Sequence, residues 1–155
     1  MRAAEESAFA RGVSVETLMD QAGAGIARAV RQFFPKPASC IVFAGKGHNG
    51  GDALVAAEQL QRIGWKIDIR LPFAETECGE LTQQKLKALR DATPKSADTI
   101  DRAPHTIILD GLLGTGAQCA FGRHQRCAYE AFRTGNNANA AKFIFVSVEF
   151  SPRQK

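Results

Sequence analysis

The sequence predicts an α/β protein in which a sheet of parallel strands lies between two layers of helices. Short apolar runs alternate along the chain with segments of helical periodicity, the order typical of strand–helix–strand units. The run at 41–44 is continuously apolar, as expected for a parallel strand that is covered on both faces, and residues 106–109 (TIIL) predict another buried strand. The length of 155 residues fits one domain, which we assign to residues 1–155.

The first strongly periodic segment predicts a helix over residues 15–34. Ser14 precedes it as a candidate N-cap, and Glu16 places a carboxylate in its first turn. Pro35 and Pro37 end it, because proline cannot continue a helix. Small residues between 22 and 27 would allow close packing against a sheet or a second helix. The apolar residues at helical spacing are Val15, Leu18, Met19, Ala22, Ile26, Ala29, Val30 and Phe33.

The later elements follow from the same patterns. A strand at 41–44 leads through a glycine-dense turn into a helical stripe at 53–63. Residues 65–71 alternate as a second strand, and residues 80–90 predict a polar helix. The strand at 106–109 is followed by a helix near 125–133 and a fourth strand at 142–150. The leucines expected to face inward from the polar helix are Leu81, Leu86 and Leu89.

Composition excludes several classes of protein. The net charge of +4 is modest and the basic residues are scattered, so we expect no nucleic-acid partner. No segment approaches the roughly 20 apolar residues of a transmembrane helix, so we expect no membrane partner. The four cysteines form neither a CxxC pair nor a zinc pattern, and reduced cytosolic thiols are the simplest interpretation. We therefore expect a cytoplasmic protein, or a mitochondrial one if a targeting segment has been removed.

The glycine-rich segment at 45–52 is the first candidate site. It follows a strand and opens a helix, so its backbone N–H groups and the helix N-terminus suit a phosphorylated or nucleotide-like ligand. Residues 45–50 also fit the G-x-G-x-x-G fingerprint, with Asp68 as the ribose-binding acid, which makes an NAD-dependent oxidoreductase an alternative. Against it, Asp52 in the first helical turn would repel a pyrophosphate, and Asp68 falls inside its strand. A tight turn without a ligand is the remaining interpretation.

Asp110 is the second candidate, because it directly follows a buried strand. A carboxylate there must be hydrogen-bonded, paired or bound to a cation. Together with the amide oxygen of Asn49 it offers hard oxygen ligands for an alkali or alkaline-earth ion, whereas its alternative role is to cap the following loop. Glu149 lies on the last strand. Since ligands of parallel sheets bind at the carboxyl ends of the strands, these features are expected to converge.

Three motifs give the chain a resemblance to a known family. They are L-M-D-Q-A-G at 18–23, G-K-G-H-N-G-G-D at 45–52 and D-G-L-L-G-T-G at 110–116. In this order they resemble the NAD(P)H-hydrate epimerases, the YjeF-type N-terminal domain. The resemblance implies a Rossmann-like three-layer α/β/α sandwich with a mostly parallel sheet. It also implies an isomerase of nicotinamide nucleotide repair, which interconverts the R and S epimers of hydrated NADH and NADPH (NAD(P)HX).

The resemblance also implies roles for particular residues. Asn49 and Asp110 would bind a potassium ion, and a small-molecule substrate, hydrated NADH or NADPH, would lie beside two segments and Glu149. The residues implied to contact substrate are His48, Asn49, Gly50, Gly51, Asp52, Gly114, Thr115, Gly116, Ala117, Gln118, Cys119, Ala120 and Glu149. A homodimer and a functional link to an NAD(P)H-hydrate dehydratase are implied as well.

The end of the chain departs from the family pattern. The family has an acid/base Asp followed by Ile-Pro-Ser-Gly, whereas this chain has Glu149 followed by Phe150, Ser151 and Pro152. Glu149 is the candidate catalytic residue, although its extra methylene displaces the carboxylate. Family domains also continue further, so we expect a domain that is incomplete at its C-terminus. A nucleotide-binding or scaffold protein of the same fold without turnover is therefore an alternative function.

Overall fold

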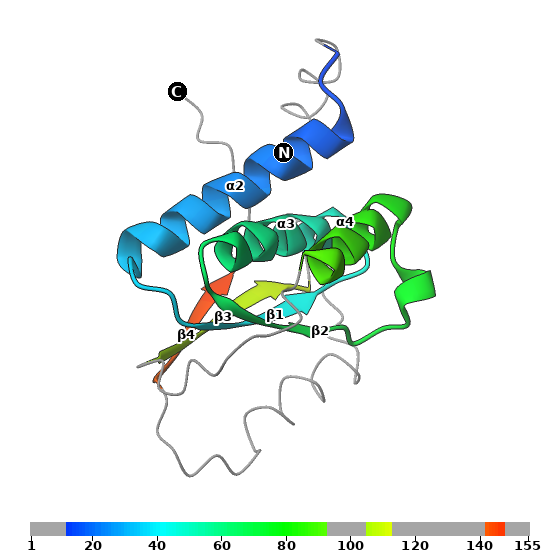
Figure 1. Cartoon of the computed structure of the whole chain (residues 1–155). Coiled ribbons are helices and arrows are strands. Elements are labelled where there is room, and N and C mark those ends of the chain that lie inside the picture. Colours follow the sequence, from blue (N-terminus) through cyan, green and yellow to red (C-terminus); the bar gives the residue numbers. More distant parts are fainter. Residues whose placement is uncertain (1–11, 93–104, 113–141, 148–155) are drawn as a thin grey trace.

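The computed structural model describes residues 12–92, 105–112 and 142–147. Its centre is a four-stranded sheet in which all neighbouring strands are parallel, in the order β2-β1-β3-β4. The strands are β1 (Ser39–Ala44), β2 (Lys66–Arg70), β3 (His105–Gly111) and β4 (Lys142–Ser147). The described helices, α2 (Val15–Phe33), α3 (His48–Arg62) and α4 (Glu80–Asp91), cover one face of this sheet (Figure 1). The α/β class and the parallel sheet are thus confirmed, while the helix predicted near 125–133 lies outside the described residues.

Helix α2 begins at the predicted cap. The side chain of Ser14 accepts a hydrogen bond from the backbone N–H of Thr17 at 3.1 Å, and α2 ends at Phe33, before the two prolines. The predicted inward face is only partly correct. Met19, Ala22 and Val30 are buried, but Phe33 is 74% exposed and Ala29 is also exposed. Because α2 packs on α3 and not broadly on the sheet, only a narrow stripe of it is covered.

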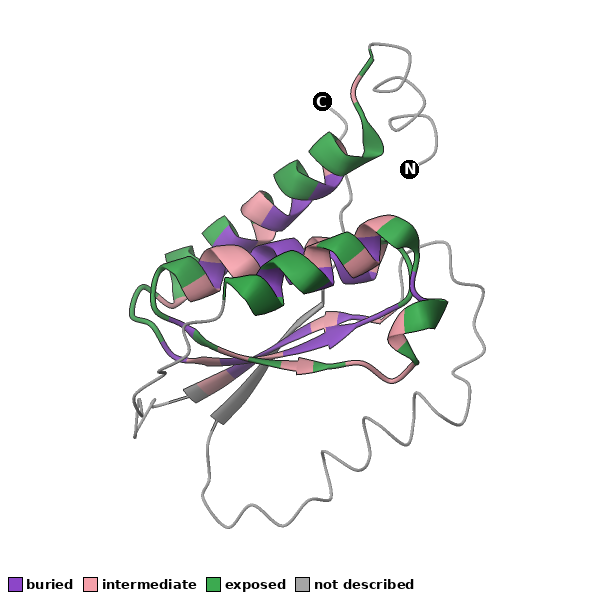
Figure 2. Ribbon diagram, turned by 45° about the vertical axis from the view of Figure 1, so that its right-hand side comes forward, coloured by how far each residue is buried: buried purple, intermediate pink, exposed green. Residues whose placement is uncertain are grey.

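Helix α3 forms the centre of the core. It contacts α2 on one side, α4 on another and the strands beneath it, so most of its residues are buried (Figure 2). Its many small residues allow this close packing. A Cβ added to Gly23 of α2 would lie only 2.5 Å from Cβ of Val55, which shows how near the two helices approach. The small-residue face of α2 is therefore used, at least in part, inside the chain.

The ammonium group of Lys85 in α4 forms ion pairs with two carboxylates of α2. The Nζ atom of Lys85 lies 2.9 Å from Oε1 of Glu16 and 2.8 Å from Oδ1 of Asp20. Burial opposes the charge of Lys85, but the hydrogen bonds that Lys85 donates to the carboxylates of Asp20 and Glu16 outweigh this effect and raise its pKa. Leu86 and Leu89 face inward as predicted, whereas Leu81 is only half-buried.

The helix-facing side of the sheet is apolar. Cys40, Val42, Ile107 and Leu109 pack in one cluster with the buried residues of α3. Burial raises the pKa of the Cys40 thiol from 9.0 to about 12, so it is a neutral core residue. In the described part of the chain no helix is long and apolar enough to cross a membrane.

Candidate functional site

The glycine-rich segment lies at the carboxyl end of β1, as predicted, but its helix starts earlier than expected. Helix α3 begins at His48, with Gly47 as its N-cap, so the connecting turn is only three residues long. Gly50 and Gly51 lie inside the helix, and Asp52 is its fifth residue. The expectation that Asp52 occupies the first helical turn is therefore wrong, and the proposed repulsion of a pyrophosphate from that position loses its basis.

The turn is joined directly to the end of β3. The backbone N–H of Gly45 donates to the carbonyl oxygen of Gly111 at 3.1 Å. On the other side of this contact, a Cβ built on Gly111 would lie 2.9 Å from the backbone oxygen of Asn49. Asn49 and the residue after Asp110 are thus neighbours, so the predicted convergence of the two motifs at one sheet edge is present.

Packing inside the chain explains most of the glycines. A Cβ on Gly45 would lie 2.8 Å from the carbonyl oxygen of Gly111 and would also collide with that of Leu112. A Cβ on Gly50 would lie 2.7 Å from the backbone nitrogen of Gly45, and one on Gly51 would collide with the end of the Met19 side chain. These three glycines let the turn, α3 and the strand end approach one another, a use that needs no ligand.

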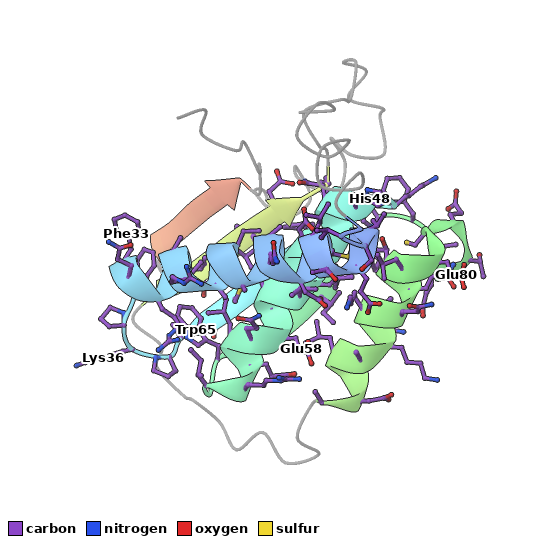
Figure 3. The ribbon with its side chains drawn as sticks, turned by 90° about the horizontal axis from the view of Figure 1, so that it is seen from above. Phe33, Lys36, His48, Glu58, Trp65 and Glu80 are labelled. Carbon is purple, nitrogen blue, oxygen red and sulfur yellow. The ribbon has the colours of Figure 1, made fainter. Side chains whose placement is uncertain are left out.

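Gly47 is different from these three. It is exposed, and a Cβ added there would meet no described atom within 4 Å. His48, the next residue, is exposed too and lies at the end of the molecule that carries Glu80, opposite Phe33, Lys36 and Trp65 (Figure 3). The open side of the segment is therefore at Gly47 and His48.

The turn is also held from the side of α4. The backbone N–H of Gly79 donates to the carbonyl oxygen of Lys46 at 2.8 Å, and the hydroxyl of Thr82 donates to that of Gly47 at 3.1 Å. The ammonium group of Lys46 lies 2.7 Å from Oε1 of Glu77, in the 3-10 helix η1 (Glu75–Glu77). The same group lies 4.4 Å from the centre of the Phe73 ring.

The ion pair with Lys46 changes the pKa of Glu77. The hydrogen bond from Lys46, supported by one from the backbone N–H of Ala74, lowers the pKa of the Glu77 carboxyl. The charge of Lys46 is thus used to fasten the glycine-rich segment to η1.

Asp110 lies within β3, one residue before its end, and not after the strand as the sequence predicted. In the sheet it pairs in register with Phe43 and with Ser147. Its Oδ1 accepts a hydrogen bond from the backbone N–H of Leu112 at 3.1 Å, so the capping role is confirmed. An ionised carboxylate offers about four acceptor positions, which leaves capacity for a cation as well.

The described residues at this edge carry oxygen ligands, which suit a hard cation. Among the described residues no group of three His, Cys, Asp or Glu side chains could hold a metal ion. Asn49 and Asp110 lie in the two segments that meet at this edge, and their side chains carry amide and carboxylate oxygens, the type of ligand that alkali and alkaline-earth ions take. Residues 114–120 and Glu149 lie outside the described residues.

Sequence reasoning missed Thr82, Glu77 and Met19 as neighbours of this segment. Thr82 belongs to α4 and is 35 residues from Gly47, so no local pattern connects the two. Met19 was assigned only to the inward face of its helix, although it stands in the L-M-D-Q-A-G motif that carries part of the resemblance. Asp68 is exposed in the middle of β2 and pairs with Arg70 at 2.7 Å, away from the position of a ribose-binding acid.

Comparison with known proteins gives a consistent picture. The model of the family described as YjeF-related protein N-terminus matches residues 15–150. An NAD(P)H-hydrate epimerase of Bordetella pertussis is 36% identical over 120 residues, which cover 75% of this chain and 50% of that protein. A bifunctional NAD(P)H-hydrate repair enzyme of Methanospirillum hungatei is 31% identical over 151 residues, covering 90% of this chain and 30% of the relative.

A solved structure supports the fold. The crystal structure of yeast ynu0 superposes with a TM-score of 0.67 at 24% identity, covering 88% of this chain and 61% of the yeast chain. The chain spans about half of the length of the Bordetella relative and about a third of that of the Methanospirillum relative.

Proposed function

This chain belongs to the family of the YjeF-related protein N-terminus, and from that premise we propose that it is an isomerase of nicotinamide nucleotide repair. Its reaction would be the interconversion of the R and S epimers of hydrated NADH and NADPH. The observation that carries the proposal is the contact between two family motifs: Gly45 of the first donates to Gly111 of the second at 3.1 Å. A site that needs both motifs can form only where they meet.

Potassium is the cation proposed for this edge. Asn49 and Asp110 would hold it, since their amide and carboxylate oxygens match its preference and the Asp110 carboxylate has acceptor capacity beyond its bond to Leu112. When bound, the ion would supply a positive charge for substrate oxygens. The open positions at Gly47 and His48 support an approach of substrate from this side, with residues 48–52 and 114–120 as its contacts.

Glu149 is the proposed acid/base. Ser147 of β4 is the register partner of Asp110, and Glu149 follows it two residues along the chain. A carboxyl group in that position would hold or move the proton at the hydrated ring carbon, C6, whose configuration is inverted. The S epimer formed would then be the substrate of a dehydratase.

We also propose that the chain acts as a homodimer and that it works in the cytoplasm.

The test starts from a single NADHX epimer. The epimers are followed by chromatography under conditions in which spontaneous exchange is slow, with potassium or with sodium as the only monovalent cation. We expect the chain to accelerate formation of the other epimer, and potassium to support more activity than sodium. An exchange rate equal to that of buffer alone contradicts the proposed activity.

One observation favours a second function, nucleotide binding without turnover. Glu149 stands where the family pattern has the shorter Asp, and a displacement of about 1 Å in a catalytic group can reduce rates by orders of magnitude. Calorimetry with NADPH separates the two functions. Binding of NADPH by a chain that does not accelerate epimerisation supports this alternative, and absence of both effects contradicts both functions.

A further inference from the structure

Thr82 is a buried polar residue that packing alone does not require. The residue is only 2% exposed, and it is the one polar or charged residue that is buried among those the structure describes. Its hydroxyl donates across 35 residues of sequence to the carbonyl oxygen of Gly47, at 3.1 Å. A buried hydroxyl needs a hydrogen-bond partner, and here that partner is the N-cap of α3.

From this contact we infer that Thr82 is a positioning residue of the proposed epimerase site, an inference that rests on the proposed function. Gly47 has no side chain with which to cap or anchor itself, and its carbonyl oxygen already accepts the helical bond from Gly51 N at 3.2 Å. Thr82 supplies a second, lateral bond to the same oxygen. The direction of the Gly47 carbonyl is thereby fixed from two sides.

Fixing the carbonyls also fixes the N–H groups that follow them. In a trans peptide the C=O of one residue and the N–H of the next point in opposite directions, and no described peptide bond is cis. The carbonyls of Lys46 and Gly47 are directed to Gly79 and Thr82 at the start of α4. The N–H groups of Gly47 and His48 therefore point away from α4, as donors on the open side of the segment.

Two variants of Thr82, measured for thermal stability and for kcat/KM, distinguish a positioning role from a structural one. Thr82→Val keeps the shape of the side chain but removes the hydroxyl, and the Gly47 carbonyl keeps its bond from Gly51, so we expect the melting temperature to fall by no more than roughly 2–4 °C. We expect kcat/KM to fall about fivefold, the effect of losing one hydrogen bond of ordinary net strength, mainly through a higher KM. Thr82→Ser keeps the donor and should restore kcat/KM to within roughly threefold of wild type.

A matched control comes from the same helix. Leu86, one turn further along α4, is 1% exposed and belongs to the apolar core. Leu86→Val should lower the melting temperature by roughly 2–4 °C while leaving KM unchanged. If Thr82→Val behaves like wild type in kcat/KM, or if its KM changes no more than that of Leu86→Val, the positioning role is refuted.

A second measurement keeps this inference distinct from the proposed activity. If the wild-type chain does not accelerate epimerisation, the proposed function has failed. The orientation itself is then judged from the ¹H–¹⁵N amide signals of Gly47 and His48 in the full chain. Shifts in Thr82→Val that are absent in Thr82→Ser support a segment held by the hydroxyl, and unchanged signals in both variants overturn it.

Discussion

Gly50→Ala tests whether the glycine-rich segment is built for close packing. Gly50 is the third residue of α3, and alanine would ordinarily improve a helix by up to about 1 kcal/mol. At this position, however, the new Cβ would lie 2.7 Å from N and 2.8 Å from C of Gly45, and closer still to its carbonyl oxygen. These are backbone atoms of a turn that is bonded to β3, so they cannot move aside without disturbing the strand end.

The expected loss of stability in Gly50→Ala follows from two opposing effects, the clash of the new Cβ and the better helix propensity of alanine. Overpacking of a core costs about 1–3 kcal/mol, and a backbone clash belongs at the upper end of that range. After subtraction of the gain in helix propensity, Gly50→Ala should lower the free energy of unfolding by about 2 kcal/mol. For a chain of this length the melting temperature should fall by roughly 4–8 °C.

Gly47→Ala is the matched control, followed in the same thermal denaturation by circular dichroism. Its Cβ would meet no described atom within 4 Å, and its φ of −102° is accessible to alanine. Alanine lowers the conformational entropy of the unfolded chain, which stabilises the variant. It is also a poorer N-cap than glycine, which destabilises the variant by a similar amount. We expect an unchanged melting temperature. A Gly50→Ala protein as stable as Gly47→Ala would refute the packing interpretation.

Two further predictions concern ionisable groups in the core and between helices. Between pH 9 and 12 the unfolded chain loses the Cys40 proton while the folded chain, with a pKa of about 12, retains it. The free energy of unfolding should therefore decrease with rising pH, by roughly 2 kcal/mol from pH 9 to 11, and urea titrations of Cys40→Ala should lack this component. Lys85→Met, which removes the ion pairs with Glu16 and Asp20, should cost about 1 kcal/mol at neutral pH, whereas Lys87→Met, on the exposed side of α4, should cost almost nothing. Since the pKa of Lys85 is raised, this contribution is present below pH 10.5 and should disappear at higher pH.

Much of the fold could be predicted because the relevant signals are local. Each of these predictions depends on neighbouring residues and was confirmed: the cap at Ser14, the prolines after α2, the continuous apolar run of β1 and the buried strand β3. Phe33 was misassigned because helical periodicity cannot show where the partner of a helix ends. Its side chain occupies the last position of α2 and is exposed.

The sequence predicted which segments meet at the candidate site, but not the contacts that hold them together. The rule that ligands bind at the carboxyl ends of parallel strands correctly placed residues 45–52 beside Asp110. The sequence could not distinguish glycines needed for close packing from glycines needed for a ligand, because both uses require the absence of a side chain. The role of Thr82 could not be predicted for another reason. Its partner, Gly47, is distant in the chain, and only the folded structure brings the two together.

The most direct test of the central claim compares two aspartates in the single-epimer assay. Asp110→Asn keeps an oxygen that can accept from Leu112 N, so the strand end should remain folded, but it removes the charge proposed to bind potassium. Asp68→Asn changes an exposed carboxylate of β2. We predict that wild type and Asp68→Asn accelerate the interconversion of NADHX epimers equally, and that Asp110→Asn loses most of this activity and its preference for potassium. Equal activity of all three proteins would contradict a site at the Asp110 edge.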